Sequence, residues 1–183
     1  MTYELRGGVV LKSVVMRFCL VAVMILCALP ICSASDSNNV IRNWVPRLSD
    51  EYFVIGGIEL GKSSPEYVKS IYGEPQKVST YMSHLYGETE TVYQYGESFF
   101  IAFVDGCAVS IGVNANNGLK TAHGIQVGDL WSKARAVYKM PWREIYSKYS
   151  HTYNYVYRGA GGWKMSIIVY NGKVKSIGML AME

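Results

Sequence analysis

Three histidines are the side chains of this sequence that could most directly serve acid–base or metal chemistry. His84, His123 and His151 lie in different segments, and none has a second His, Cys or acid at a metal-ligand spacing. No serine stands in the local signature of a nucleophile elbow. The sequence therefore predicts no catalytic residues and no metal site. A hydrolase stays open as an alternative, provided that folding gathers titratable groups in a concave pocket.

Other residues of chemical interest have simpler interpretations. The glycines of Gly57–Gly61 resemble a phosphate loop only superficially, and the repeat explains them better as turn positions. Glu88 and Glu90 are expected to be exposed loop carboxylates rather than an acid–base pair. Cys107 has no His or basic neighbour in sequence that would activate its thiol, so we expect a small strand residue. We expect no cofactor.

Tyrosine is the residue type best suited to a binding surface here. The chain has 15 tyrosines among 183 residues. Tyrosine offers a large contact area at a low entropic cost, but it is also favoured in strands, where its ring can be half-buried. Both interpretations remain open at this point. The predicted partner-binding residues are Tyr93, Tyr95, Phe100, Val109, Tyr153, Tyr155 and Tyr157.

An internal repeat determines which elements position these residues. Gly57–Gly61 and Gly124–Gly128 share the pattern Gly-Ile-x-Leu/Val-Gly. Farther along, the triplet Ser-Ile-Gly recurs at Ser110–Gly112 and Ser176–Gly178. Ordered similarity of this kind indicates two copies of one structural unit of roughly 66 residues.

The sequence of each copy predicts the same order of a short helix followed by strands. A short helix begins near Ser63 in the first copy and near Asp129 in the second. Strand-like stretches follow, and the dipeptides at 105–106 and 171–172 predict tight hairpin turns. The predicted fold class is α+β, a tandem repeat of short helices packed on antiparallel sheets of three to four strands. The predicted divisions are a signal peptide (1–34), a linker (35–50), a first repeat (51–120) and a second repeat (121–183).

The hairpin turns also predict which side chains share a face of the sheet. In the first repeat the core face is expected to hold Phe99, Ile101, Phe103, Ala108, Ser110 and Gly112. The other face then holds Phe100, Ala102, Val104, Cys107, Val109, Ile111 and Val113, without a charge. Such a surface must be covered. The cover is either internal (the linker, the second repeat or Tyr52–Ile55) or a partner protein, whereas the second repeat presents a mostly polar outer face.

The N-terminal residues predict export. Arg17 precedes the uncharged apolar run Phe18–Ile31, and small residues then allow cleavage after Ala34. A start at Met16 would give a conventional signal. An uncleaved anchor helix is the alternative, although the run is short for a bilayer and contains Pro30. The expected location is periplasmic or secreted.

The charge of the chain limits the classes of partner it is expected to bind, and its cysteine content limits its disulfides. The formal net charge is +4, and no basic run or stripe stands out, so nucleic acid is not an expected partner. Only Cys107 lies beyond the leader, so the exported part cannot build an internal disulfide framework. A protein partner is expected, with membrane contact only through the export signal.

The paired Gly-Ile-x-Leu/Val-Gly segments, each followed by a short helix, a tyrosine-rich strand and a hairpin, resemble the β-lactamase-inhibitor-protein-like superfamily. This superfamily includes outer-membrane assembly lipoproteins of the SmpA/OmlA type. The resemblance covers roughly Tyr52–Met182. It implies short helices on small antiparallel sheets and a scaffold that binds proteins through its sheet face and loops. The inhibitor's disulfides and the lipoprotein's lipidated cysteine have no counterpart here. The expected function is therefore a non-enzymatic protein-binding module, with inhibition of a secreted or periplasmic enzyme as a narrower alternative.

Overall fold

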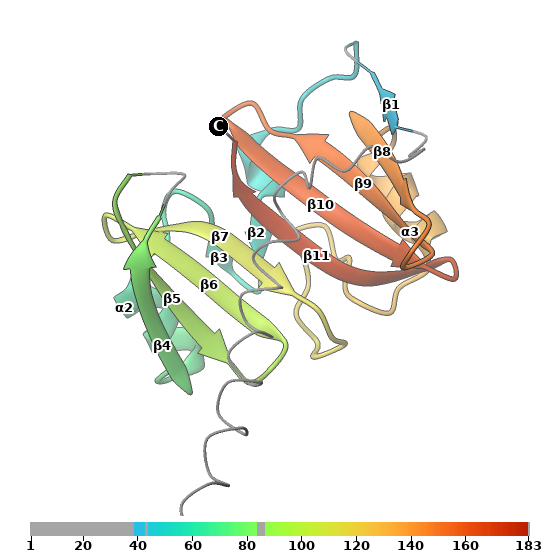
Figure 1. Ribbon diagram of the computed structural model, residues 1–183. Helices are drawn as coiled ribbons and strands as arrows, with labels where there is room; N and C mark the ends of the chain where they lie inside the picture. Colours follow the sequence, from blue (N-terminus) through green and yellow to red (C-terminus); the bar gives the residue numbers. More distant parts are fainter. Residues whose placement is uncertain (1–38, 43, 84–86, 183) are drawn as a thin grey trace, which may run out of the picture. The chain divides into compact units, whose positions relative to one another are not determined.

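Nine antiparallel strands form one sheet in the computed structural model, which describes residues 39–42, 44–83 and 87–182 (Figure 1). From edge to edge the order is β1 (Asn39–Ile41), β8 (Arg143–Ser147), β9 (Thr152–Arg158), β10 (Trp163–Tyr170), β11 (Lys173–Ala181), β7 (Cys107–Val113), β6 (Phe99–Val104), β5 (Thr89–Tyr95) and β4 (Lys77–Met82). A second sheet pairs β2 (Val54–Ile55) with β3 (Ile58–Glu59). The helices in the described residues are α2 (Pro65–Tyr72), α3 (Trp131–Tyr138) and a 3-10 turn at Asp50–Tyr52.

The predicted fold class is wrong in its central feature. The described residues are mostly strand, and one nine-stranded sheet replaces the expected helices on separate three- to four-stranded sheets. The sheets merge because β7 and β11 pair with each other, from Ser110 opposite Leu180 to Val113 opposite Ile177. A sequence pattern identifies extended segments, but an open strand edge can accept a partner from either repeat.

The two repeats are related by a local two-fold arrangement. The equivalent glycines of the two Ser-Ile-Gly triplets, Gly112 and Gly178, lie opposite each other on β7 and β11. The residues just before the two Gly-Ile-x-Leu/Val-Gly segments also meet, since Ile55 of β2 forms an antiparallel bridge with Thr121. The strands that carry the two Ser-Ile-Gly triplets, β7 and β11, thus pair with each other within one sheet.

A β-bulge in each hairpin reverses the predicted faces beyond it. Next to the first turn the register is as predicted, but it shifts between Ala102 and Phe103, which leaves Val109 as the extra residue. Lys175 is the equivalent extra residue in the second hairpin. Because side chains alternate with a period of two, one inserted residue moves every later side chain to the other face.

The reversal corrects the predicted core of the first repeat. Ile111 and Val113, which were expected on the outer face, are buried in the core. Ser110 and Gly112 lie on the opposite face instead, beside Phe100. The charge-free outer surface predicted from the sequence therefore has fewer large side chains than expected.

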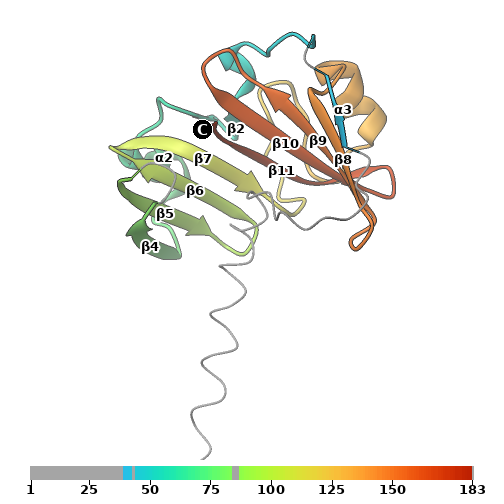
Figure 2. The ribbon, with the colours of Figure 1, turned by 45° about the horizontal axis from the view of Figure 1, so that its top comes forward.

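One face of the large sheet carries the hydrophobic core and is called the helix face. Its strands contribute Ile101, Ile111, Ile167 and Ile177, and α2 and α3 add Val68, Ala134 and Tyr138. Figure 2 shows α3 against β8 and β9. Two further segments, 53–60 and 125–127, contribute to the same core with Phe53, Ile55, Ile58, Leu60, Ile125 and Val127. The segment Tyr52–Ile55 thus packs on the helix face through two of its side chains rather than covering the opposite face.

The helix starts differ in detail from the predicted ones. Ser64, not Ser63, is the N-cap of α2, and its hydroxyl accepts the backbone N–H of Tyr67 at 3.2 Å. The second helix follows Leu130 and has no side-chain cap. The carboxylate of Asp129 instead accepts the backbone N–H of Gln126 at 3.0 Å, which stabilises the turn before the helix.

The predicted signal peptide (1–34), with its alternative anchor helix and start at Met16, lies outside the described residues. The predicted linker (35–50) enters them with β1, which pairs with β8 from Asn39 opposite Ile145 to Ile41 opposite Arg143. Ser37–Glu183 forms one compact unit. No helix within residues 39–42, 44–83 and 87–182 is long and apolar enough to cross a membrane.

Candidate binding surface

The predicted partner-binding residues do not share one surface. The five tyrosines lie on the helix face, through β5 (Tyr93, Tyr95) and β9 (Tyr153, Tyr155, Tyr157). Phe100 lies on the opposite face of the sheet. Val109 is the extra residue at the β7 bulge. The structure therefore divides the predicted set into an aromatic group on one side and two separate residues.

Burial divides the aromatic group further. Tyr93, Tyr155 and Tyr157 are only 8%, 9% and 2% exposed, so these three rings are core residues rather than surface residues. They are buried because strand alternation directs them beneath the helices. Tyr95 is half-buried and donates its hydroxyl to the carbonyl of Gly73 at 3.0 Å, which ties β5 to the end of α2. Among the five, only Tyr153 is largely accessible, at 41%.

Tyr153 belongs to a continuous row of rings, called here the aromatic row, made of Trp131, Tyr155, Tyr153 and Tyr146. Trp131 stacks on Tyr155 with 3.8 Å between ring centroids and an interplanar angle of 12°. Tyr155 is followed by Tyr153 at 5.9 Å and 14°, and Tyr153 by Tyr146 at 4.9 Å. The row therefore runs from the buried ring of Tyr155 to accessible rings at the β8–β9 hairpin.

Strand pairing and a helix terminus hold the row in place. Tyr146 of β8 pairs directly with Tyr153 of β9, and Tyr155 follows two residues later on the same face. Trp131 is the first residue of α3, and its backbone N–H donates to the carbonyl of Gly172 at 2.8 Å. This bond fixes the start of α3 against the β10–β11 turn, so the indole is held over β9.

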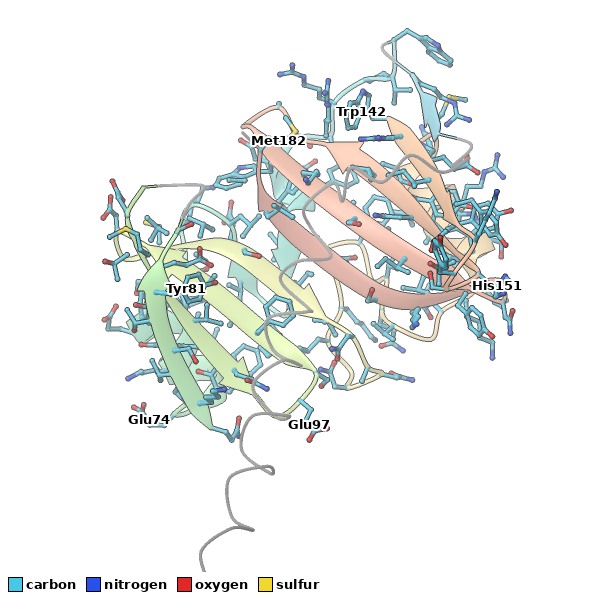
Figure 3. All side chains as sticks on the ribbon, viewed as in Figure 1. Glu74, Tyr81, Glu97, Trp142, His151 and Met182 are labelled. Atoms are coloured by element: carbon cyan, nitrogen blue, oxygen red, sulfur yellow. The ribbon has the colours of Figure 1, made fainter. Side chains whose placement is uncertain are left out.

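The turn that joins β8 to β9 extends the row into solvent. Tyr149 in this turn is 91% exposed. His151 follows with a positive φ of 51°, and its Nδ1 lies 3.3 Å from the hydroxyl of Tyr146. Figure 3 labels His151 at this end of the two strands. Exposed and half-buried aromatic rings thus meet at one hairpin.

The electrostatic environment keeps the buried part of the row neutral. Burial, together with the nearby Glu144 and Tyr153, raises the pKa of Tyr155 to about 12, while Arg135 acts in the opposite sense. The phenol is therefore uncharged near neutral pH. The row offers flat apolar rings with hydroxyl groups at their edges, a combination that suits a protein interface.

Sequence reasoning found part of this surface and missed the rest. It selected Tyr153 for its place in a tyrosine-rich strand, but it did not select Trp131, Tyr146 or Tyr149. Trp131 was visible only as a member of the apolar helix stripe, and Tyr146 lies in a segment, β8, to which no strand was assigned. The missing signal was the pairing of β8 with β9, which brings Tyr146 beside Tyr153.

Phe100 and Val109 have structural roles on the opposite side of the sheet. The ring of Phe100 lies on Gly112, since a Cβ built there would be 1.9 Å from Phe100 Cζ. Ala102 and Val104 on the same face are buried, and Val109 is half-buried in the bulge. The side chain of Phe100 therefore fills the space that a glycine leaves on the neighbouring strand.

The residues considered for acid–base or metal chemistry have separate surroundings. His123 packs against the ring of Tyr52 at 3.9 Å, and His151 lies at the aromatic row. His84 lies outside the described residues. The described part of the chain contains no group of three His, Cys, Asp or Glu that could hold a metal ion. Cys107 begins β7 as a free thiol, as expected for a strand residue.

A hollow of about 370 Å³ lies at the start of α2. It is lined by Gly57, Glu59, Lys62, Ser63, Ser64 and Tyr67. Its carboxylate, Glu59, forms an ion pair with Lys62, and the hydroxyl of Ser63 accepts the backbone N–H of Glu59 at 2.9 Å. These contacts tie β3 to the start of α2, and they account for the polar side chains of the hollow as structural groups.

Comparison with known proteins adds three distant structural likenesses. No protein-family model matches the chain, and no curated protein sequence matches it. The chain is similar to a DUF4309 family protein (YjgB) from Bacillus subtilis, with 14% identity, a TM-score of 0.38, and coverage of 68% of this chain and 82% of that one. It is also similar to a protein from Streptococcus mutans provisionally assigned as a β-lactamase inhibitor protein, with 13% identity, a TM-score of 0.30, and coverage of 67% and 85%.

The third likeness covers the largest share of this chain. It is an extracellular protein containing an SCP domain from Bacillus anthracis, with 10% identity, a TM-score of 0.46 and coverage of 78% of this chain. This chain spans 50% of that longer protein. All three TM-scores lie below 0.5.

Proposed function

We propose that this chain is an exported, non-enzymatic protein-binding module that contacts a protein partner through the aromatic row and the β8–β9 turn. The observation that carries the proposal is the continuity of the row. It begins at the stacked pair of half-buried Trp131 and buried Tyr155 and runs through the accessible ring of Tyr153 to Tyr146, next to the turn that exposes Tyr149. Anchored aromatic rings with exposed neighbours are typical of interface hot spots.

The chemistry of the row supports a protein partner. Its rings are fixed by stacking and by strand pairing, so little side-chain entropy is lost when a partner covers them. Tyr153 and Tyr149 expose apolar ring surface together with a hydroxyl that can donate or accept a hydrogen bond. Inhibition of an enzyme would be one specific form of such binding.

The proposal is tested by site-specific photo-crosslinking in the organism's own envelope and culture fluid. A photo-reactive amino acid replaces Tyr149 in one form of the full chain and Met82, which is exposed on β4 at the far edge of the sheet, in another. We expect a discrete protein adduct from position 149 and none from position 82. Equal adducts at both positions, or none at 149, contradict the proposal.

The captured protein is then purified and its affinity measured directly. We expect Tyr153→Ala to weaken binding by about ten-fold or more, as at an interface hot spot. Tyr170→Ala is the matched control, because Tyr170 is similarly exposed but lies on the opposite face of the sheet. If both substitutions have the same effect, the aromatic row is not the interface. An activity assay of a captured enzyme, with and without this chain, decides whether binding also inhibits.

A further inference from the structure

Three buried side-chain nitrogens at the other end of β8 and β9 have no hydrogen-bond acceptor among the residues that the structure describes. They are Nη1 of Arg42, Nε1 of Trp142 and Nε of Arg158. A buried donor without a partner costs about 1–3 kcal/mol, and more when it is charged. Three of them in one place therefore require an explanation, and an absent ligand is a common one.

A backbone hydrogen bond joins Arg42 to Trp142, and the side chains of Trp142 and Arg158 are in direct contact. The backbone N–H of Arg42 donates to the carbonyl of Trp142 at 2.8 Å. The guanidinium of Arg158 lies over the indole ring of Trp142, with 3.5 Å between Cζ and the ring centroid. The stack fixes the plane of this guanidinium, since a cation prefers the face of a tryptophan ring.

The charge of the cluster is only partly compensated. Glu144 lies 3.6 Å from Nη2 of Arg42, which leaves Nη1 of the same guanidinium without an acceptor. Within the described residues, Arg158 forms no ion pair with a carboxylate, and its recorded contact is the stack on Trp142. The cluster thus has two guanidinium cations, one partly shared carboxylate and three unused donors.

We propose that Arg42, Trp142 and Arg158 form a binding site for a carboxylate. A planar carboxylate presents two acceptor oxygens that match the planar donors of a guanidinium, and the indole N–H supplies a neutral third donor. The site is separate from the aromatic row, because Trp142 and His151 lie at opposite ends of β8 and β9 (Figure 3). It does not depend on the proposed partner.

The indole N–H of Trp142 provides a direct test by NMR on the full, ¹⁵N-labelled chain. Sodium acetate is titrated at constant ionic strength against sodium chloride, and the indole signals are followed. We expect a saturable downfield shift of the Trp142 signal with acetate. The signal of Trp131, which stacks on Tyr155 in the aromatic row, should remain in place and report that the fold is intact. No saturable shift, or the same shift with chloride, overturns the proposal.

Two further measurements make the assignment specific. Arg158→Gln should weaken acetate binding by about ten-fold, because it removes a charged donor. The indole signal of Trp131 should persist in this variant and show that it is folded. Sodium phosphate tests the alternative anion, and tighter binding of phosphate than of acetate would refute a carboxylate site. N-acetylglycine and N-acetylglutamate α-amide then distinguish a chain-terminal carboxylate from a side-chain one, and saturable binding of either supports the proposal.

Discussion

Gly112 of β7 lies directly opposite Gly178 of β11, and the two glycines occupy equivalent positions in the two repeats. Their surroundings differ on one side of the sheet. The ring of Phe100 lies on Gly112, whereas a Cβ built at Gly178 would meet no atom within 4 Å. Ser166, the residue opposite Gly178 on β10, is the smaller counterpart of Phe100. Two positions with the same backbone role therefore have opposite tolerance for a side chain.

The first prediction compares alanine at these two positions. Gly112→Ala should destabilise the chain by about 1–3 kcal/mol, because the new methyl group overlaps the ring of Phe100. Gly178→Ala should stabilise it by about 0.5–1 kcal/mol, since alanine loses less backbone entropy on folding and the space is open. Urea unfolding of both variants measures the difference. If Gly112→Ala regains stability in a Phe100→Ala background, the ring is the cause, and equal stability of the two single variants contradicts the prediction.

A second pair of glycines tests the contact between the repeats. Gly61 has a φ of 74°, and a Cβ there would lie 2.7 Å from Cζ2 of Trp163 on β10. Gly57 has a similar φ of 83°, but its surroundings are open. Gly57→Ala should therefore cost only the left-handed backbone conformation, about 1–2 kcal/mol. Gly61→Ala should cost about 1–3 kcal/mol more, because the indole must move.

The measurement is thermal and urea unfolding of both variants, each also made in a Trp163→Leu background. The additional cost at Gly61 should disappear in that background and the cost at Gly57 should not change. A Gly61 penalty that persists without the indole would mean that backbone strain alone explains it.

The sequence predicts local elements well where local chemistry decides them. The two hairpin turns at 105–106 and 171–172 are confirmed, because positive φ at the turn residues favours the Asp-Gly and Asn-Gly dipeptides found there. The bulges at Val109 and Lys175 were not predicted. A bulge depends on how the paired strands twist and has no fixed residue signature here. Its consequence was large, since Ile111 moved from the predicted outer face into the core.

The pairing of β7 with β11 was beyond sequence reasoning for a related reason. Each strand alone is compatible with an edge or a central position, and only the complete set of edges decides between them. The same limit applies to the candidate site. Tyr153 has an accessible ring, but Tyr155 and Tyr157 have the same residue type and spacing and are buried. Residue type could not separate them, because their burial depends on α3 packing over β9.

The hydroxyl of Tyr157 leads to a third prediction. This hydroxyl is buried without a hydrogen-bond partner, whereas Tyr138, whose ring lies 5.4 Å away, donates its hydroxyl to Thr121 at 2.8 Å. Tyr157→Phe should therefore leave stability unchanged or raise it slightly, because an unpaired polar group is removed from the core. Tyr138→Phe should cost about 1 kcal/mol, the value of a typical hydrogen bond. Urea unfolding measures both, and a greater loss for Tyr157→Phe would show that its hydroxyl has a partner.

The buried tyrosines also predict how stability depends on alkaline pH. Burial, together with the nearby Tyr52, raises the pKa of Tyr138 from an ordinary value of 10.0 to about 12, while the hydrogen bond to Thr121 acts in the opposite sense. Because the folded chain holds this proton more tightly, the resulting stabilisation is complete below pH 10. It is lost as pH rises from 10 to 12, at about 1.4 kcal/mol per pH unit for one such group. Tyr138→Phe should reduce the slope of unfolding free energy against pH in this range by that amount. Tyr149→Phe, which removes a phenol from solvent, is the control. The measurement is urea unfolding of the unmodified chain, Tyr138→Phe and Tyr149→Phe at several pH values between 8 and 12. The same slope of unfolding free energy against pH in all three would contradict the prediction.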